Sequence, residues 1–241
     1  MAATTIGRQV TEAHRAAQAR LAAQTALAVR AAFGLLDPED LDGSTERWLR
    51  AVVPIVTGQR VKSATLAANY MTAFKSAEVG VGSRVALVLA DQVPVQQVIT
   101  SMTVTGPVSV KRAMTRLTPL DTAVSTAQAN TARSGIRLAL GGGRDTVIET
   151  VAADRQASGW ARVASGRPCA FCAMLASRGA VYDRGSSAFH AHDGCSCSAE
   201  PVYRTDSALP PSSERWAAMW DEAQRGDGDP VKNFQALVEA A

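Results

Sequence analysis

All four cysteines of this 241-residue chain lie between Cys169 and Cys197, together with two of its three histidines. Cys169 and Cys172 form a C-x-x-C pair, and Cys195 and Cys197 form a C-x-C pair. Each spacing puts two sulfurs on one side of the chain, the first in a tight turn and the second in an extended segment. Four thiols and two imidazoles so arranged are typical of a tetrahedral zinc site. The segment is therefore predicted to fold around one structural zinc ion.

More candidate ligands are present than the four positions of a tetrahedral zinc ion can hold. The C-x-x-C pair is the firmest part of the set, and His192 has the H-x-x-C spacing that makes it a better ligand than His190. His190 is predicted either to contact one of the metal ligands without binding the ion itself or to be exposed. One of the last two cysteines is predicted to stand beside the ion without binding it. The predicted metal ligands come from Cys169, Cys172, His192, Cys195 and Cys197.

Two disulfides, or free structural thiols, are the alternatives to zinc. The first thirty residues have no signal-peptide core, and no run approaches the roughly 18 apolar residues of a membrane span. The chain is therefore expected to be kept in a cytoplasm, where disulfides are rare. That expectation favours zinc over the disulfides.

Alternating sequences on both sides of the cysteines predict two strands. GWARVASG, residues 159–166, is predicted to enter the C-x-x-C turn, and CSCSAEPVY, residues 195–203, to leave the motif. The two strands can pair, with AMLASRG after Cys172 forming a short helix. Alanine is common elsewhere and aromatic residues make up only 5% of the chain, which favours helices. The predicted fold class is mainly α, with long Ala-rich helices and a small zinc-knuckle β-hairpin in the C-terminal third.

Helical spacing is clearest at the start of the chain. From about Thr4 to Phe33 there is no proline, and apolar or small residues recur at spacings of three, four and seven. Gly34 is predicted to end this helix. Ser44 or Thr45 is predicted to cap a second helix that begins near Glu46.

Several features predict interruptions further along. Pro54 and Gly58 predict a kink or break in the second helix. VALVLA at residues 85–90 is too short for a membrane span and predicts a buried strand or helix segment. Residues 91–140 are predicted to form short helices separated by turns, the last of them capped by Asp121.

GGGR at residues 141–144 predicts a flexible joint, because no GxxxxGK[ST] pattern accompanies it to suggest a phosphate-binding loop. Trp216 and Trp220, four residues apart in the tail, are predicted to pack in a core. The predicted division is a helical domain over 1–140, a joint and short helix over 141–157, a Cys/His zinc-knuckle module over 158–203, and C-terminal helices over 204–241.

Charge is uneven along the chain, although the net charge is only +3. Residues 107–137 hold five basic residues and one acid, which gives +4. Residues 200–241 hold four basic residues and eight acids, which gives −4. Solvated helix faces explain these segments more simply than a contact surface does. The weak net charge, without interleaved basic and aromatic residues, argues against a nucleic-acid-binding knuckle.

The cysteine motif resembles that of the Mu F-like minor capsid proteins of tailed bacteriophages, most closely the branch found in phages of actinobacteria. In that family a C-x-x-C segment is followed, after a short spacer, by H-x-x-C-x-C. The resemblance covers roughly residues 158–203, with weaker similarity in the preceding helices and in the tail from Trp216 to Leu237. The matching residues are Cys169, Cys172, Leu175, Gly179, His192, Cys195 and Cys197.

The resemblance implies a structural or assembly component of a phage head. Such proteins bind the portal or the major capsid protein while the head assembles in the host cytoplasm. They are expected in several copies in the virion, in the capsid interior or the portal region, and without a membrane. Contact with packaged DNA is expected to be weak. Whether they are ejected with the genome is left open. Asp193-Gly194 stands where the family usually has Pro-Asn, and Ser196 stands where it has Arg. The ligands are therefore intact, whereas any role of that arginine is weakened.

A capsid maturation protease, or another Cys- or zinc-dependent hydrolase, is the alternative function, because members of this branch are often described as proteases. Such an enzyme would use Cys169 or Cys172 together with His190 or His192. His14 is predicted to be exposed on its Ala-rich helix, which leaves no further histidine for a triad.

A catalytic zinc ion also needs an open coordination position and a nearby general base. There is no glutamate between residues 169 and 197, although Asp183 and Asp193 remain as candidates. A structural role is therefore favoured over an enzymatic one.

Overall fold

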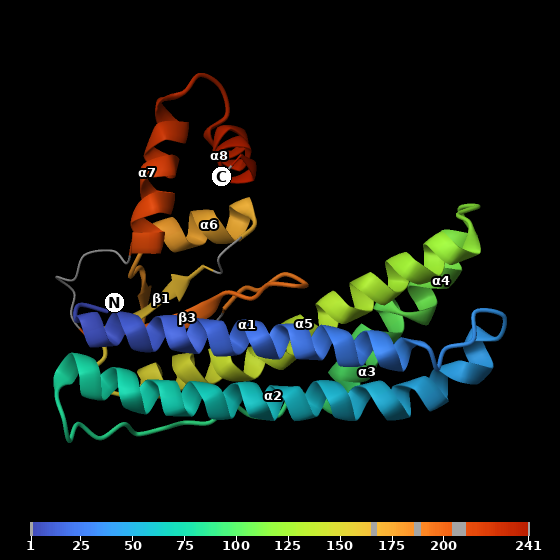
Figure 1. The fold of residues 1–241 in the computed structure, drawn as a ribbon, viewed down its shortest axis with the longest axis horizontal. Coiled ribbons are helices and arrows are strands. Elements are labelled where there is room, and N and C mark those ends of the chain that lie inside the picture. The colour runs from blue at the N-terminus through green and yellow to red at the C-terminus, as the bar shows by residue number, and fades with distance from the viewer. Residues whose placement is uncertain (1, 165–167, 186–188, 204–210, 241) are drawn as a thin grey trace.

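Three long helices form the body of the protein. The structure is a computed structural model that describes residues 2–164, 168–185, 189–203 and 211–240. Helices α1 (Thr5–Phe33), α2 (Leu41–Val79) and α5 (Leu120–Ala153) lie side by side along its longest axis (Figure 1). Two shorter helices, α3 (Val95–Thr105) and α4 (Pro107–Met114), pack at one end of this body. The prediction of a mainly α fold is confirmed.

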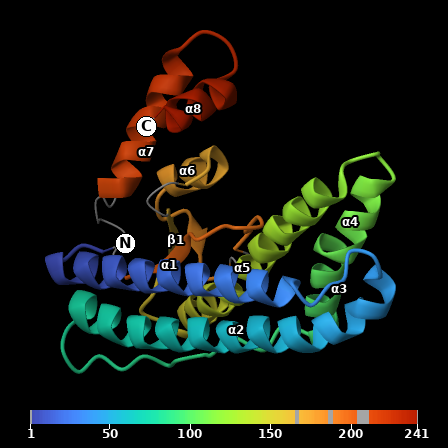
Figure 2. The same cartoon turned by 45° about the vertical axis from the view of Figure 1, so that its right-hand side comes forward.

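The C-terminal third lies on one side of the body. It holds β1 (Gly159–Val163), α6 (Ala170–Ser177), β2 (Tyr182–Asp183), β3 (Ser198–Val202), α7 (Pro211–Arg225) and α8 (Pro230–Glu239). Helices α7 and α8 form a hairpin that packs on α6 and projects away from the three long helices in both views (Figures 1 and 2). None of the helices in the described part of the chain is long and apolar enough to cross a membrane.

The small sheet has the order β2-β1-β3, and both pairs are antiparallel. The predicted pairing of the two flanking strands is confirmed, with Gly159 opposite Val202 and Val163 opposite Ser198. The two-residue strand β2 was not predicted. Of the first predicted strand, residues 165 and 166 lie outside the described part of the chain.

The sheet is anchored to the body by both apolar and polar contacts. Trp160 of β1 is fully buried in one core cluster with Phe74 of α2. Glu200 of β3 is also fully buried, and its carboxylate accepts hydrogen bonds from the Thr11 hydroxyl at 2.5 Å and from the Ala2 amide at 2.9 Å. Because a buried carboxylate must be hydrogen-bonded to be tolerated, these bonds fix β3 against α1.

The predicted flexible joint at residues 141–144 is wrong, because these residues lie inside the continuous helix α5. A Cβ on Gly142 would approach the Arg60 carbonyl oxygen of α2 to 2.3 Å, and one on Gly143 would approach the Ser63 hydroxyl to 2.7 Å. Because these glycines have no side chain, α5 packs closely against α2. The glycines are therefore packing residues and do not form a flexible joint.

Other element boundaries also differ from the predictions. Helix α2 begins at Leu41, where the Asp40 carboxylate accepts from the Gly43 amide at 3.0 Å, so the predicted Ser/Thr cap is wrong. It runs unbroken through Pro54 and Gly58. Because Pro54 is exposed, the carbonyl that it deprives of a partner can reach water, and the apolar face on the other side stays packed.

The apolar run at residues 85–90 is neither a helix nor a strand, contrary to prediction. It is held along α5 by the Thr150 hydroxyl, which accepts from the Val88 amide at 3.1 Å and donates to the Val88 carbonyl at 3.2 Å. Leu87 and Leu89 are largely exposed. In α5 itself Pro119 occupies the N-cap position, so the predicted cap at Asp121 is also wrong.

The tail confirms one prediction about packing. Trp216 is only 5% exposed, and the Trp220 ring meets the Phe234 ring edge-on at 5.2 Å. Both tryptophans belong to an apolar cluster that includes Cys172 and Cys195. The predicted domain boundary at residue 204 lies outside the described residues. The division of the chain into separately folding domains stays a prediction.

Candidate metal centre

The predicted ligands gather where α6 meets the segment before β3. Cys169 is the N-cap of α6, and its sulfur accepts the Cys172 amide at 3.5 Å. This cap turns the C-x-x-C pair so that both sulfurs point the same way. His192, Cys195 and Cys197 come from the extended segment that leads into β3. We call these five residues the metal cluster.

Three pairs of donor atoms in the metal cluster lie close to one another. His192 Nε2 lies 3.1 Å from Cys169 Sγ and 3.3 Å from Cys172 Sγ. Cys172 Sγ lies 3.6 Å from Cys195 Sγ. Zinc bonds of about 2.3 Å to sulfur and about 2.0 Å to nitrogen separate tetrahedral ligand atoms by roughly 3.5–3.8 Å. The sulfur–sulfur distance lies in this range and the two sulfur–nitrogen distances are slightly shorter, so the donor set could hold a zinc ion after a small expansion.

The five donors form two overlapping groups that share Cys172. Cys169, Cys172 and His192 make one group, and Cys172, Cys195 and Cys197 make the other; within each, all donor atoms lie within 4.8 Å of one another. Cys169 and His192 are exposed, whereas the other three are nearly fully buried. The cluster could thus hold a metal ion at the boundary between the protein interior and solvent.

The thiols of the cluster polarise one another. The pKa of the Cys195 thiol lies well below its usual value, because Cys172 and Cys197 hydrogen-bond to it and the Arg144 guanidinium attracts its thiolate. The pKa of Cys172 lies well above its usual value, because its hydrogen bonds to the same two cysteines stabilise the protonated form and burial adds to this. A preformed thiolate is the species that binds zinc.

Two buried arginines beside the cluster were not predicted. Arg162 of β1 is 1% exposed, and its Nη1 lies 3.9 Å from Cys172 Sγ while its Nη2 donates to the His190 carbonyl at 2.8 Å. Arg144 of α5 donates to the carbonyls of Cys197 at 2.9 Å and Cys195 at 2.5 Å. The sequence does point to one of them: Arg162 is a charged residue in the middle of an otherwise apolar predicted strand.

These two arginines share an aromatic platform. The guanidinium carbons of Arg162 and Arg144 lie 3.7 Å and 5.0 Å from the centre of the Phe189 ring. An aromatic face stabilises a cation that has left water. Two positive charges are thereby held next to thiols that can ionise.

The remaining histidines lie outside the metal cluster. His190 is exposed, and its contribution is the backbone carbonyl that binds Arg162. The prediction that His14 is exposed is wrong: its side chain is 6% exposed and stacks on the Tyr70 ring with centroids 4.3 Å apart. Burial lowers the pKa of His14 to about 4. Neutral and enclosed, it is a packing residue.

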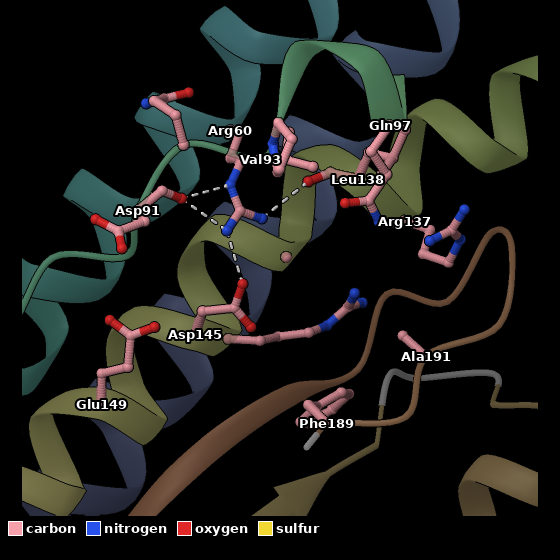
Figure 3. Close-up of a pocket in the computed structure, with 14 residues that line it drawn as sticks. Arg60, Asp91, Val93, Gln97, Arg137, Leu138, Asp145, Glu149, Phe189 and Ala191 are labelled. Carbon is pink, nitrogen blue, oxygen red and sulfur yellow. Dashed lines mark hydrogen bonds and ion pairs between the residues drawn. The ribbon is translucent and has the colours of Figure 1, made fainter. Parts of the chain in front are cut away.

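A cavity of about 300 Å³ lies next to the cluster, between α5 and the segment that carries Phe189 and Ala191 (Figure 3). The Arg60 side chain lines this cavity and donates to the Asp145 carboxylate at 2.7 Å and to the Asp91 carbonyl at 2.9 Å (Figure 3). Its fourteen lining residues include no Ser, Thr, Cys or His, so it presents no side chain suited to be a nucleophile in a protease.

One acid in that cavity has a shifted pKa. Burial raises the pKa of Glu149, and the neighbouring Asp145 and Asp91 carboxylates raise it further. A general acid or base needs a reacting group beside it. None of the five metal-cluster donors lines this cavity, so the two sites do not form one catalytic arrangement in the described part of the chain.

A family model described as VG15 protein matches residues 5–223, which is most of the chain. The chain belongs to the VG15 protein family. The VG15 match spans the three long helices, the metal cluster and most of α7. It suggests a viral protein and is compatible with a phage structural protein. No curated protein and no solved structure matches the chain significantly.

Proposed function

We propose that this VG15-family chain is a structural component of a tailed-phage head, carries one zinc ion, and associates with the portal, the major capsid protein or both during assembly. Family membership and the Mu F-like cysteine motif support the phage assignment. The observation that carries the structural role is the metal cluster itself, whose donors are two sulfurs and one imidazole nitrogen in the first group and three sulfurs in the second. Such donor sets are typical of closed structural zinc sites.

The ligands that we assign to the ion are Cys169, Cys172, His192 and Cys195. His192 Nε2 lies 3.1 Å from Cys169 Sγ and 3.3 Å from Cys172 Sγ, and Cys172 Sγ lies 3.6 Å from Cys195 Sγ. Cys195 belongs to the other donor group, so binding one ion would draw Cys195 toward Cys169 and His192. Cys197 is then the fifth donor, next to the ion without binding it. A zinc ion held here would supply a strong crosslink between α6 and the segment that enters β3.

Charge balance supports this ligand set. Three thiolates and one neutral imidazole around a dication leave one net negative charge, which is costly to bury unless a cation is near. Arg162 and Arg144 supply positive charge from β1 and α5. They compensate for Ser196, which stands where related motifs have an arginine between the two cysteines.

The hydrolase alternative lacks the groups that it requires. No carboxylate belongs to either donor group among the described residues. Asp193 is engaged by Arg137, whose Nε lies 2.5 Å from its Oδ1. His14 is buried against Tyr70 on the helical body. A zinc-bound water would therefore have no carboxylate among the donor groups to act as its general base. A cysteine nucleophile would have His192, which binds the ion in our proposal, or the exposed His190, whose carbonyl binds Arg162.

A matched pair of serine variants tests the ligand assignment. Purified wild-type protein should contain about one zinc per chain. Cys195→Ser should lower zinc retention sharply during dialysis, whereas Cys197→Ser, two residues away and equally buried, should retain the ion. Equal loss in both variants would contradict our choice of the fourth ligand. A folded, zinc-free wild type with two disulfides would overturn the metal site.

Co-expression with the phage coat and portal proteins tests the function. The chain should co-purify with portal or procapsid, and coat protein should keep its full mass. Raised salt should weaken early association, because exposed charges are screened over about 8–10 Å. Cleaved coat protein that becomes intact with a still-folded His190→Ala, His192→Ala variant would make the chain a protease. His190→Ala by itself should retain zinc and controls for surface effects.

The proposal also gives a location. The protein would lie in the virion, in the capsid interior or at the portal, in several copies. With a net charge of +3, contact with packaged DNA would be weak and would fall steeply with salt.

A further inference from the structure

The cavity of about 300 Å³ beside α5 has unlike charges at its two ends (Figure 3). Arg137 lies at one end of the stretch of α5 that lines the cavity, and Glu149 lies at the other end, on the same side as Asp91 (Figure 3). At a rise of 1.5 Å per residue, the two α5 residues are about 18 Å apart along the helix axis. The two ends therefore present opposite potentials to a molecule that enters the cavity.

A glycine keeps the middle of the cavity open. Four lining residues follow one another along α5 at intervals of four: Arg137, Gly141, Asp145 and Glu149. Gly141 has no side chain to fill the space between the charged ends. The Asp145 carboxylate accepts from the Arg60 guanidinium at 2.7 Å, so these two charges compensate each other. Uncompensated charge is therefore found mainly at the two ends.

Arg144 and Arg137 supply the positive end. Arg144 is 4% exposed, and its Nε and Nη2 donate to the uncharged backbone carbonyls of Cys197 and Cys195. Arg137 donates from Nε to the Asp193 carboxylate at 2.5 Å. Among the described residues, Nη1 of either arginine has no hydrogen bond, and no carboxylate forms an ion pair with Arg144. A guanidinium that is nine-tenths buried and keeps an unused donor favours an anion beside it.

Glu149 and Asp91 supply the negative end. Neither carboxylate forms an ion pair within the part of the chain that the structure describes. Burial raises the pKa of Glu149, and the neighbouring Asp145 and Asp91 carboxylates raise it further. Carboxylates that raise the pKa of a third one create a negative potential there, and a bound cation would relieve it. An ammonium group is therefore favoured at this end.

We propose that the cavity binds a short zwitterion, whose carboxylate contacts Arg144 and Arg137 and whose ammonium group contacts Glu149 and Asp91. A bound anion without a cationic group would compensate only the first pair, and a bound cation only the second. The ligand needs both charges on one molecule, separated by a chain that passes Gly141. A cavity of this volume is at the lower end of the range for small-molecule sites.

The middle of the cavity suits methylene groups. Val93, Leu138 and Phe189 line it and provide an apolar wall. The same chemistry occurs in a free ω-amino acid and in a peptide segment that carries a lysine close to an acidic residue. The inference does not depend on zinc or on a portal or coat partner, because no metal-cluster donor lines the cavity.

Calorimetric titration of the full chain with ω-amino acids from aminobutanoate to aminooctanoate tests the proposal. One chain length should bind best, with a Kd on the order of 1 mM or lower. Hexanoate and hexylamine, which carry one charge each, should bind about tenfold more weakly than aminohexanoate. A lysyl-glycyl-glutamate peptide with blocked ends distinguishes the sources. Tighter binding than any ω-amino acid would assign the site to a partner's segment, and weaker binding would assign it to a small molecule.

Two variants locate the ligand, each with a matched control. Arg137→Met and Glu149→Gln remove one charge from opposite ends, and each should weaken binding of the best ω-amino acid about tenfold. Glu149→Gln should also narrow the preference for aminohexanoate over hexanoate, because the ammonium group loses a partner. Arg133→Met, at an exposed position one turn earlier on α5, and Glu222→Gln on α7 should bind like wild type. An unchanged Tm and zinc content show that each variant is folded.

Three results would overturn the proposal. The first is the absence of saturable binding by every ω-amino acid and by the peptide at the highest soluble concentration. The second is a wild type that binds hexanoate or hexylamine as tightly as aminohexanoate. The third is wild-type affinity for the best ligand in both Arg137→Met and Glu149→Gln.

Discussion

The three-helix body and the metal cluster with its neighbours hold together in different ways. In the body, α5 approaches α2 so closely that Gly142 has no room for a Cβ beside the Arg60 carbonyl. Dispersion and apolar burial over three long helices stabilise that part. In contrast, α6 has eight residues and the α7–α8 hairpin packs mainly on it. We call α6, residues 189–197 and the hairpin the metal region.

The two parts obtain their stability from different sources. We expect the body, with its larger buried apolar core, to fold without help, whereas small units need a metal or another crosslink to compensate for a small core. Cys172 and Cys195 sit in the same apolar cluster as Trp216 and Phe234 of the hairpin. Zinc bound there would therefore order both the motif and the tail.

The largest expected effect is on the metal region. Cys172→Ser removes the donor shared by both groups, so zinc content should fall from about one per chain to near zero. Proteolysis should then cleave around α6 and α7 and leave the long helices intact. Cys197→Ser is the matched control and should resist cleavage like wild type. Equal cleavage of the body in Cys172→Ser would contradict a separate role of zinc in the metal region.

A smaller effect is expected on the body at low pH. His14 has a folded pKa of about 4 against the ordinary value of 6.5. The unfolded chain therefore binds the proton more readily between these values, and stability present above pH 6.5 is lost as pH falls toward 4. The loss by pH 4 is about 3 kcal/mol.

His14→Phe tests this dependence, since it removes the titrating group from the body. Urea unfolding of the body should then depend less on pH between 6.5 and 4 than in wild type. An unchanged slope would show that other groups, such as the buried Glu200, dominate acid unfolding.

Two glycine variants sharpen the account of the body. Gly142→Ala should destabilise it by roughly 1–3 kcal/mol, because a Cβ 2.3 Å from a backbone carbonyl forces the helices apart. Gly58→Ala in α2 meets nothing within 4 Å and should stabilise by about 0.5–1 kcal/mol. Thermal unfolding measures the stability of both variants. If Gly142→Ala leaves the stability of the body unchanged, the glycine run is a flexible segment and not a packing site.

The smallest effect concerns the arginines behind the metal cluster. Arg162→Met keeps the length of the side chain and removes its charge, and it should lower zinc affinity about tenfold. Competition with a coloured zinc chelator measures this. Arg112→Met, at an exposed position of α4, is the control and should bind zinc like wild type. Unchanged affinity in Arg162→Met would mean that the cluster needs no buried cation.

Features that follow from local spacing were predicted well from the sequence. The helical spacing up to Phe33 gave the extent of α1, and the alternation around Trp160 gave β1 and its pairing with β3. The five candidate ligands meet in space because two short spacings, C-x-x-C and H-x-x-C-x-C, fix most of the geometry. Which four of them bind metal stays a prediction.

Features that depend on distant contacts were missed. Gly141 to Gly143 suggest flexibility by local propensity, and only the close approach of α2 shows that they are packing residues. His14 lies on an Ala-rich helix and is buried because Tyr70 stacks on it from α2. Arg144 reaches the cluster from a helix more than fifty residues away, as the bond to Cys195 shows.

Hydrogen exchange on the zinc-loaded protein, before and after a chelator, tests most directly the claim that a metal holds the metal region while the body stands without it. After chelation, amides of α6 and of the α7–α8 hairpin should lose protection. Amides of α1, α2 and α5 should keep theirs, and β1 and β3 should lose only part, because Trp160 and Glu200 tie them to the body. Uniform loss from α1 onward, or no loss anywhere, would contradict the account.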